Sequence, residues 1–260
     1  MIDGHMHLEY GPLTKEYVLE FVEAAKKMGL TKIQILDHTH RFKEFTPIYE
    51  GVKNAHVYQK EWLEKKKLDS IEEYHQLIEE IKNLDLDIEV TFGLEVCYVP
   101  EYEDFLKDIL SKYPYDFLVG AVHSIDGILY DMNFSQEILW NVKDVNDIYI
   151  RYYELVLACV NSDLFTQLAH PDTIKLFNIY PTYDLTSTYH KIAEACLKHH
   201  VKAENNTGCY YRYGHKDMGL SDELLNIFKE HNVEMITASD AHYPGHVGTN
   251  IKDIYEKTMQ

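Results

Sequence analysis

The stretch IDGHMH at residues 2–7 ends in two histidines that are two positions apart. We expect a short β-strand here, because side chains at positions i and i+2 of a strand point the same way and His5 and His7 could then converge on one ion. Thr14 can cap a helix over residues 15–28, and Gly29 suits the position that closes it. The start of the chain therefore predicts a strand with a histidine pair at its carboxyl end, followed by a helix.

The same order, a short apolar run and then a helical pattern, repeats along the whole chain. Serial β–α alternation predicts parallel strands, and 260 residues suit a closed α/β barrel with one unit fewer than the usual eight. We expect one domain over residues 1–260. The predicted strands cover residues 2–7, 32–38, 89–95, 117–123, 165–170, 201–205 and 233–239, and the predicted helices cover residues 15–28, 71–81, 101–111, 145–160, 183–200, 221–229 and 246–257.

One connection is much longer than the others and runs from Thr39 to Asp69. A loop of this length inside an α/β domain is usually a lid or a binding segment, unless it contains helices of its own. The segment is mostly polar, so the sequence does not show where such helices would begin and end. We therefore expect residues 39–69 either to cover a functional site or to carry further helical turns.

The charge balance is strongly acidic, with 25 Lys and Arg against 43 Asp and Glu and a formal net charge of −18. Nucleic-acid binding needs a basic footprint, and an anionic membrane surface repels an acidic protein, so we expect neither as a partner. An anionic substrate must be small and must meet cations gathered in one place. Only Arg41, Arg151 and Arg212 are arginines, which restricts two-pronged recognition of a phosphate to a few positions.

The amino terminus lacks the basic region and the apolar stretch of a signal peptide, and no apolar segment is long enough to cross a membrane. The cysteines show no paired spacing, which is typical of reduced thiols rather than of a disulfide framework. We therefore expect a cytoplasmic protein. The cysteines are Cys97, Cys159, Cys196 and Cys209.

Side chains that can bind metals stand at the carboxyl ends of six of the seven predicted strands. Chemistry collects at this end of parallel α/β barrels, so the joint pattern points to a metal site although each histidine alone does not. Imidazole and carboxylate ligands without thiolates favour zinc, manganese or iron. Eight ligands exceed one tetrahedral shell, so we expect at least two ions with Glu95 placed to bridge them. The candidates are His5, His7, His38, Glu95, His123, His170, Asp240 and His242.

Two of the three arginines lie just beyond predicted strand ends. Arg41 follows the second strand and Arg212 follows the sixth, whereas Arg151 lies inside a predicted helix. A bidentate arginine beside metal ions is a common arrangement for binding a phosphoryl group. We therefore expect Arg41 and Arg212 to contact phosphate, with His40 and Lys43 as further substrate-binding candidates.

At these positions the sequence resembles the PHP (polymerase and histidinol phosphatase) superfamily over essentially the whole chain. The motifs that carry the resemblance are HMH at 5–7, DH at 37–38, GLE at 93–95, His123, His170 and DAH at 240–242. Within the superfamily, the sequence is most similar to the monofunctional histidinol-phosphatases. That similarity lies in GAVHSIDG at 120–127, AHPD at 169–172, ENNTG at 204–208 and the loop with Arg212.

The resemblance implies a distorted (β/α)7 TIM-like barrel, the PHP fold, that holds two to three divalent ions. It also marks Glu95, Asp240 and His242 as catalytic. Many relatives have a further histidine in the loop after the first strand, where this chain has Leu13, so the third ion would either use Glu9, water or the substrate or bind weakly. The implied ligand sets are His5, His7, Glu95 and Asp240 for one ion, Glu95, His123 and His170 for a second, and His38 and His242 for the third.

The resemblance further implies a phosphomonoesterase that releases L-histidinol and phosphate from L-histidinol phosphate in histidine biosynthesis. A hydroxide bridging two ions would attack phosphorus. Another PHP phosphoesterase, acting on phosphotyrosine in proteins or on nucleotides, is the nearest alternative. An amidohydrolase also begins with a His-x-His strand, but that family usually carries a lysine or carboxylate on the fourth strand, where this chain has His123. A metal-binding module without catalysis is the last alternative.

Overall fold

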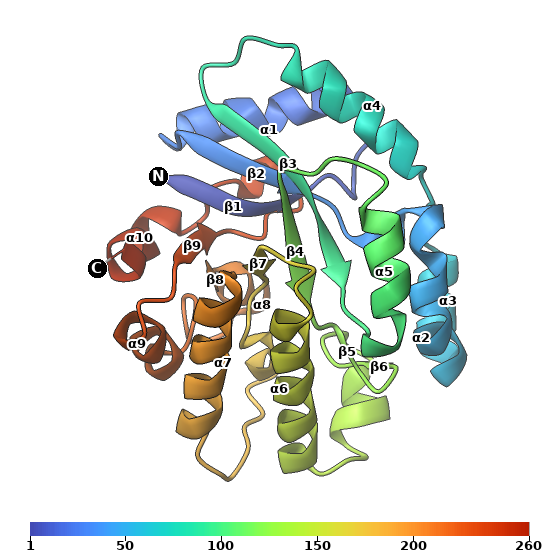
Figure 1. Cartoon of the computed structure of the whole chain (residues 1–260), viewed down its shortest axis with the longest axis vertical. Coiled ribbons are helices and arrows are strands. Elements are labelled where there is room, and N and C mark those ends of the chain that lie inside the picture. Colours follow the sequence, from blue (N-terminus) through green and yellow to red (C-terminus); the bar gives the residue numbers. More distant parts are fainter. Residues whose placement is uncertain (260) are drawn as a thin grey trace.

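The computed structural model describes residues 1–259, and its centre is a seven-stranded sheet in the order β1-β2-β3-β4-β7-β8-β9 (Figure 1). Every neighbouring pair in this sheet is parallel. The predicted α/β architecture with seven parallel strands is therefore confirmed. The strands are β1 (Ile2–His7), β2 (Lys32–Leu36), β3 (Glu89–Cys97), β4 (Phe117–Ala121), β7 (Gln167–Leu168), β8 (Lys202–Asn206) and β9 (Met235–Ala238), and a separate hairpin pairs β5 (Ser124–Ile125) with β6 (Ile128–Leu129).

The first and last strands approach each other and nearly close the sheet into a barrel. The His7 amide donates to the Ala241 carbonyl at 2.7 Å, just beyond the end of β9. Nearer the amino ends, Thr237 Oγ1 donates to the Ile2 carbonyl at 2.6 Å. These bonds bring the ends of β1 and β9 to the same rim, which is the geometry that the predicted metal site requires.

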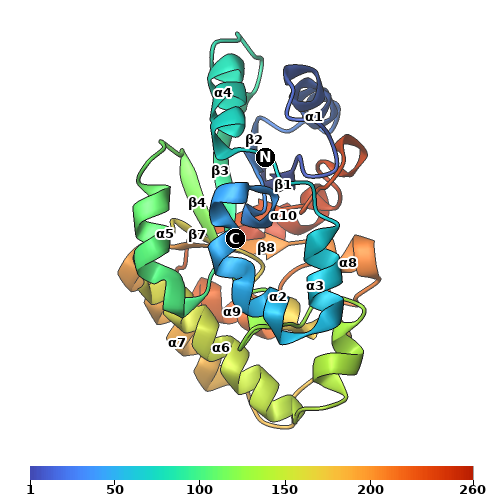
Figure 2. The same cartoon turned by 90° about the vertical axis from the view of Figure 1, so that its right-hand side faces the viewer.

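The helices surround this barrel, with α1 and α4 on one side and α6 and α7 on the opposite side in both views (Figures 1 and 2). Their caps follow the sequence: the Tyr17 amide donates to Thr14 Oγ1 at the start of α1, and Ser70 and Glu73 form a capping box on α4. The helices are α1 (Lys15–Lys27), α2 (Glu50–Ala55), α3 (Val57–Glu64), α4 (Ile71–Lys82), α5 (Glu103–Leu110), α6 (Val145–Asn161), α7 (Thr186–His199), α8 (Gly208–Tyr213), α9 (Asp222–Glu230) and α10 (Ile251–Met259).

Apolar side chains form two layers, because residues along a strand alternate between the helices and the barrel interior. Ile33 and Ile35 of β2 belong to the same large cluster as Phe21 of α1. A second, small cluster consists of residues from the strands and their ends and includes Leu36 and Val119. The apolar filling of the barrel supports a polar layer at the carboxyl rim, where the side chains predicted to bind metal stand.

The long connection over residues 39–69 contains helices of its own, which is one of the two structures expected for it. It holds two 3-10 helices, Thr39–Arg41 and Lys43–Tyr49, followed by α2 and α3. Its aromatic residue Tyr49 is buried, so the segment packs on the barrel rather than extending into solvent.

Most predicted boundaries differ from the structure by one to five residues, and two of these differences lie beside special local conformations. The strand predicted over residues 165–170 is only Gln167–Leu168, because His170 adopts a left-handed backbone with φ of 24°. The last helix begins at Ile251 rather than at residue 246, because Pro244–His246 forms a separate 3-10 turn. Both differences fall next to predicted ligands, where the chain leaves regular structure.

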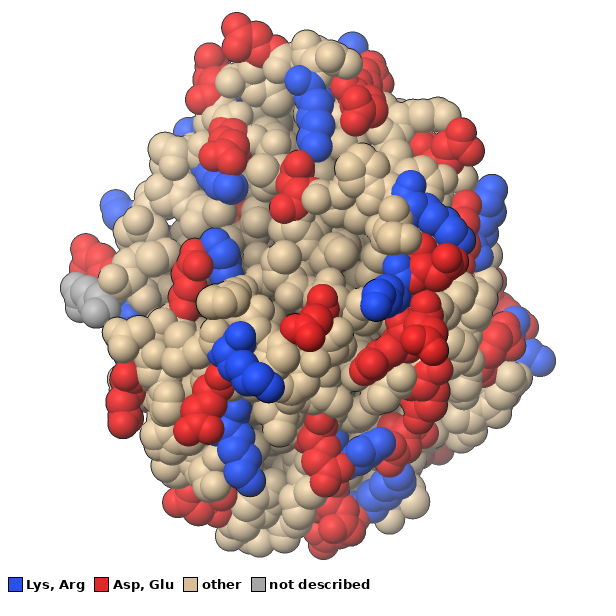
Figure 3. All heavy atoms as spheres, in the orientation of Figure 1, with Lys and Arg blue, Asp and Glu red and all other residues tan. Residues whose placement is uncertain are grey.

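The surface distributes its charge without a basic stripe on the face shown in Figure 3, where acidic and basic side chains are interspersed. Within residues 1–259, no helix is both long and apolar enough to cross a membrane.

Candidate metal centre

The eight side chains predicted to bind metal lie together at the carboxyl rim of the barrel. β1 supplies two of them and β3 supplies a carboxylate, while the loops after β2, β4, β7 and β9 supply the others. Elements far apart in the sequence therefore meet at one point because the strands are parallel and the barrel is nearly closed. The eight are His5, His7, His38, Glu95, His123, His170, Asp240 and His242.

One group joins the histidine pair of β1 to the loop after β9. His5 Nε2 and His7 Nε2 lie 2.8 Å apart, which is the result of their i, i+2 spacing on the strand. Asp240 Oδ1 lies 3.3 Å from His7 Nε2 and 3.8 Å from His5 Nε2. Three ligand atoms from two ends of the chain thus face one small space.

A second group surrounds the carboxylate of Glu95, which is only 1% exposed. Glu95 Oε1 lies 3.2 Å from His123 Nε2 and 3.0 Å from His170 Nε2. Glu95 Oε2 lies 2.6 Å from His38 Nδ1. A single carboxylate on β3 therefore contacts histidines from the loops after β2, β4 and β7.

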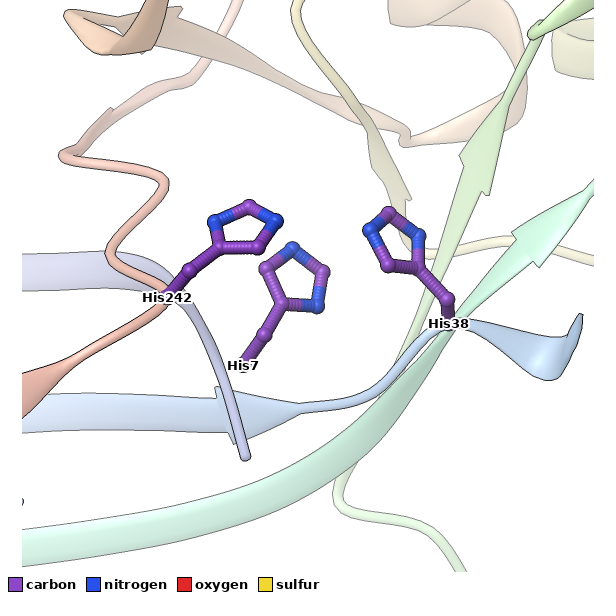
Figure 4. A group of neighbouring side chains, drawn as sticks. All are labelled: His7, His38 and His242. Atoms are coloured by element: carbon purple, nitrogen blue, oxygen red, sulfur yellow. The ribbon is translucent and has the colours of Figure 1, made fainter. Parts of the chain in front are cut away.

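A third group consists of His7, His38 and His242, whose rings face one another from three separate segments (Figure 4). The His7 ring centroid lies 4.1 Å from that of His38 and 4.4 Å from that of His242. His7 also belongs to the first group and His38 to the second. Glu95 Oε2 lies 3.7 Å from both His5 Nε2 and His7 Nε2, so its two oxygens face different groups.

Three polar atoms of this cluster lack the hydrogen-bond partners that buried polar atoms normally have. His7 Nδ1, Glu95 Oε2 and His170 Nδ1 are buried and make no hydrogen bond, although Glu95 Oε2 is close to an imidazole nitrogen. Unpartnered buried polar atoms are costly and rare. Divalent cations satisfy such converging imidazole and carboxylate lone pairs, so these residues fit zinc, manganese or iron.

The carboxylates of the cluster are ionised in the folded chain. Burial opposes the charge of Glu95, but His38, His123 and His5 together hold its pKa well below the usual range. Burial likewise opposes the charge of Asp240, while Arg212 and His242 lower its pKa strongly. Two negative charges are therefore available to cations near neutral pH.

Two histidines of the cluster are neutral near neutral pH in the ion-free chain. Burial, with the nearby His38 and His242, lowers the pKa of His7 well below its usual value. Burial also lowers the pKa of His242 to about 4. A neutral imidazole keeps the lone pair that metal coordination requires.

Two further carboxylates, for which the sequence indicates no role, contact the second ring nitrogen of two predicted ligands. His5 Nδ1 lies 2.8 Å from Glu204 Oε1, and His123 Nδ1 lies 3.0 Å from Asp131 Oδ2. Glu204 stands on a strand that the sequence already placed at the rim, so its position was a usable signal. Asp131 follows the β5–β6 hairpin, which no sequence pattern predicted.

Two predicted ligands have unusual backbone conformations. His170 has φ of 24° and Asp240 has φ of 57°, a region that residues with a side chain rarely occupy. Asp240 is also closely packed against Gly208, where an added Cβ atom would lie 2.6 Å from Asp240 Oδ2. Strained backbone at such positions is typical of functional sites, where surrounding contacts hold it in place.

The positions of Arg41 and Lys43 do not fit the phosphate contacts predicted for them. Arg41 is 4% exposed and donates to Asp69 at 2.7 Å, to Asp37 at 2.8 Å and to the Gly11 carbonyl at 2.9 Å. The 3-10 turn after β2 directs this guanidinium into the protein, where it fastens the 39–69 segment. Lys43 is largely exposed and is not among the residues that line the cavity above the metal cluster.

Arg212 and His40, in contrast, both line that cavity. Arg212 Nη1 donates to Asp240 Oδ2 at 3.0 Å, and its guanidinium lies over the Tyr213 ring. His40 Nε2 lies 3.1 Å from Glu9 Oε2, and burial lowers the pKa of His40 to about 3. Arg212 therefore offers a cation beside the metal cluster, while His40 is neutral near neutral pH.

The remaining wall of the cavity comes largely from segments that the sequence left unassigned. The long 39–69 segment contributes Tyr49, Trp62 and Lys66. Lys66 Nζ lies 4.6 Å from the centre of the Trp62 ring and 3.7 Å from Glu9 Oε2, so a lysine of this segment borders the cavity, whereas Arg41 does not. The other wall residues include Leu129, Met132, Thr173, Leu176 and Cys209.

Glu9 lies beside the third group, in the loop after β1. Glu9 Oε1 is 3.6 Å from His242 Nε2. Burial opposes its charge, but His38, His40 and Lys66 lower its pKa far below the usual value. A carboxylate of the loop after β1 therefore lies near His242, whereas the side chain of Leu13 in the same loop has no atom that can bind a metal.

The sequence of the chain matches a known protein family over most of its length. The model of the PHP domain family matches residues 3–233. Among curated proteins, the chain is 25% identical to a probable histidinol-phosphatase of Deinococcus radiodurans, over 97% of this chain and 90% of that protein. It is 23% identical to a histidinol-phosphatase of Bacillus subtilis, over 95% of each chain.

Solved structures share the fold over nearly the full length. A protein from Listeria monocytogenes superposes with a TM-score of 0.78 at 19% identity, covering 97% of this chain and 99% of that one. A histidinol phosphate phosphatase from Lactococcus lactis, crystallised with Zn, L-histidinol and phosphate, gives a TM-score of 0.68 at 18% identity, covering 99% and 92%. The nearly closed seven-stranded parallel barrel is the fold of these structures.

Proposed function

The chain belongs to the PHP domain family, and from that premise we propose that it is a metal-dependent phosphomonoesterase that hydrolyses L-histidinol phosphate to L-histidinol and phosphate. The curated relatives across the whole length are named histidinol-phosphatases. A relative in fold binds zinc together with L-histidinol and phosphate, which are the two products of this reaction. The proposal assigns the same chemistry to this chain.

The observation that carries the proposal is the position of Glu95 among histidines from three loops, with Arg212 on the wall of the adjoining cavity. Divalent ions in such a cluster would supply a hydroxide nucleophile near neutral pH and neutralise charge on a phosphoryl group. We assign two to three ions to the eight ligands, with Glu95 shared between ligand groups. Glu9 joins His242 at the third position.

Arg212 supplies the fixed cation for the phosphoryl oxygens in this proposal. Its Nη1 donates to Asp240 Oδ2 and its Nη2 donates to the Tyr213 hydroxyl at 3.4 Å. A guanidinium has five N–H groups, so donors remain for a second anion in the cavity that Arg212 lines. Lys66 replaces Arg41 as the other cation that borders the cavity. Together they would offset part of the charge that a phosphate brings into an acidic protein.

The organic part of the substrate would occupy the part of the cavity away from the ligands. Tyr49 and Trp62 supply aromatic surface there, and Leu129, Met132 and Leu176 supply apolar surface. A flat imidazole ring suits stacking on such walls, and the small cavity, about 190 Å³, fits a compact ester better than a phosphorylated protein loop.

The four cysteines are free, and three of them are buried. Reduced thiols are typical of proteins that work in a reducing compartment. We therefore propose the cytoplasm as the place of the reaction.

The test is phosphate release from L-histidinol phosphate by protein that has been freed of metal and then reloaded with zinc, manganese or iron. Phosphotyrosine peptide and nucleotides serve as competing substrates in the same assay. We expect the highest kcat/KM for L-histidinol phosphate and loss of turnover on chelation. A higher kcat/KM for one of the other esters would replace the proposed substrate, and no turnover with any metal would leave a binding module.

A further inference from the structure

Glu204 is a buried carboxylate on β8, the strand that supplies none of the predicted ligands. It is 0% exposed and accepts hydrogen bonds at both oxygens. His5 Nδ1 and Gln167 Nε2 each lie 2.8 Å from Oε1. The His170 amide at 3.2 Å and Asn206 Nδ2 at 3.1 Å face Oε2. A carboxylate offers about four acceptor sites, so these donors leave none for an ion.

The contact with His5 decides which ring nitrogen faces the metal cluster. Because a carboxylate only accepts, the 2.8 Å contact with Glu204 Oε1 keeps the proton on His5 Nδ1. His5 Nε2 then points toward His7 Nε2 at 2.8 Å and toward Asp240. Glu204 thus aims the lone pair of His5 at the first ligand group.

The contact with His170 holds a strained backbone. His170 has φ of 24°, and its amide donates to Glu204 Oε2. In this conformation the His170 ring reaches Glu95, with Nε2 3.0 Å from Oε1. One carboxylate therefore fixes a ring orientation on β1 and a backbone conformation after β7.

We propose that Glu204 is a positioning residue that sets the metal affinity of the centre by holding His5 and His170 at the same time. The proposal rests on the metal-binding part of the proposed function and not on the choice of substrate. Carboxylates behind metal-binding histidines fix the tautomer of the ring, and their loss typically lowers metal affinity by roughly 10–100-fold. Glu204 differs from a simple partner of this kind because it serves two ligands on opposite strands of the barrel.

Glu204→Gln tests the proposal with a side chain of the same shape. The new amide has one oxygen that accepts and one NH2 group that donates, whereas all four neighbouring groups donate to Glu204. The His170 amide cannot turn, so the amide oxygen will face it and the NH2 group will face His5. His5 must then carry its proton on Nε2, the atom that a metal needs.

The measurement is zinc affinity of the full-length protein, determined by competition with a chelator of known affinity and with zinc as the only ligand. Ile81→Ala serves as the control, because Ile81 is buried on α4 near the amino end of β3, away from the rim. Melting of the metal-free proteins shows how far each variant is destabilised. Glu204→Asp retains the charge on a shorter side chain and provides a second variant if Glu204→Gln does not fold.

We expect zinc affinity to fall roughly 10–100-fold in Glu204→Gln, less in Glu204→Asp, and not at all in Ile81→Ala. Unchanged affinity in a folded Glu204 variant would overturn the proposal. So would an equal loss in Ile81→Ala at matched destabilisation, since it would reduce Glu204 to a stabilising residue. Zinc binding that depends on Glu204 in a protein inactive on L-histidinol phosphate would refute the proposed substrate and leave this role intact.

Discussion

Replacing Glu95 by glutamine should remove the shared carboxylate of the metal centre while preserving its shape. Glu95 Oε1 lies 3.0 and 3.2 Å from two imidazole nitrogens, and Oε2 lies 2.6 Å from a third. The substitution removes one negative charge from ligand groups that would hold more than one cation. Charge stabilisation by catalytic metal ions is worth several kcal/mol, so a loss of about 4 kcal/mol lowers kcat/KM on the order of a thousandfold.

The assay combines phosphate release from L-histidinol phosphate with metal content after dialysis. Glu89→Gln is the matched control, because Glu89 begins the same strand, is largely exposed and pairs with Lys32 at 2.8 Å. Exposed pairs of this kind contribute little, so the control should keep its activity and its metal. An unchanged kcat/KM in Glu95→Gln with full metal content would refute the reasoning that places Glu95 between the ions.

Three further outcomes follow from the geometry. Arg212→Ala should lower kcat/KM for phosphate esters by roughly 10²–10³-fold, as loss of an anion-binding donor does, and should change Tm little. A large fall in Tm would show that Arg212 stabilises the fold instead. Arg41→Ala should instead destabilise the fold by about 3–5 kcal/mol in urea unfolding, because it leaves buried Asp37 unpaired; unchanged stability would contradict this. Burial lowers the pKa of His75 from 6.5 to about 4. As the pH is lowered from 6.5 to 4, the unfolded chain therefore binds a proton before the folded chain does, and the free energy of unfolding falls. Metal-free His75→Phe should lose less stability over that window than the unsubstituted chain.

The meeting of the eight predicted ligands at one rim could be predicted, because each lies on a strand or within four residues after one. The i, i+2 rule aligns His5 with His7, and parallel strands bring their carboxyl ends to one rim. The rules place these residues at the rim without fixing the loop conformations that orient His38, His123, His170, Asp240 and His242. They therefore anticipated a cluster whose members include Glu95 and Asp240, which are 145 positions apart in the chain.

The substrate side could not be predicted in the same way, because loop geometry decides it. Arg41 and Arg212 both follow strands, yet one guanidinium turns back to Asp69 and the other borders the cavity. Asp69 is 28 positions from Arg41, and no local pattern links the two. Lys66 reaches the site only because α2 and α3 fold the long segment over the barrel.

The carboxylates that contact the predicted ligands, Glu204 and Asp131, could be predicted only in part. Glu204 lay at a predicted strand end, but its role depends on contacts to His5 and His170 that only the closed barrel creates. Asp131 depends on a short hairpin with no strong sequence signal. Residues that act through other residues are therefore harder to find from sequence than the ligands themselves.

The most direct test of the central claim is phosphate release from L-histidinol phosphate before and after removal of metal with a chelator, followed by re-addition of zinc, manganese or iron. We expect turnover that disappears on chelation and returns with at least one of these metals. Turnover that survives complete removal of metal, or its absence with every metal in a folded protein, would contradict it.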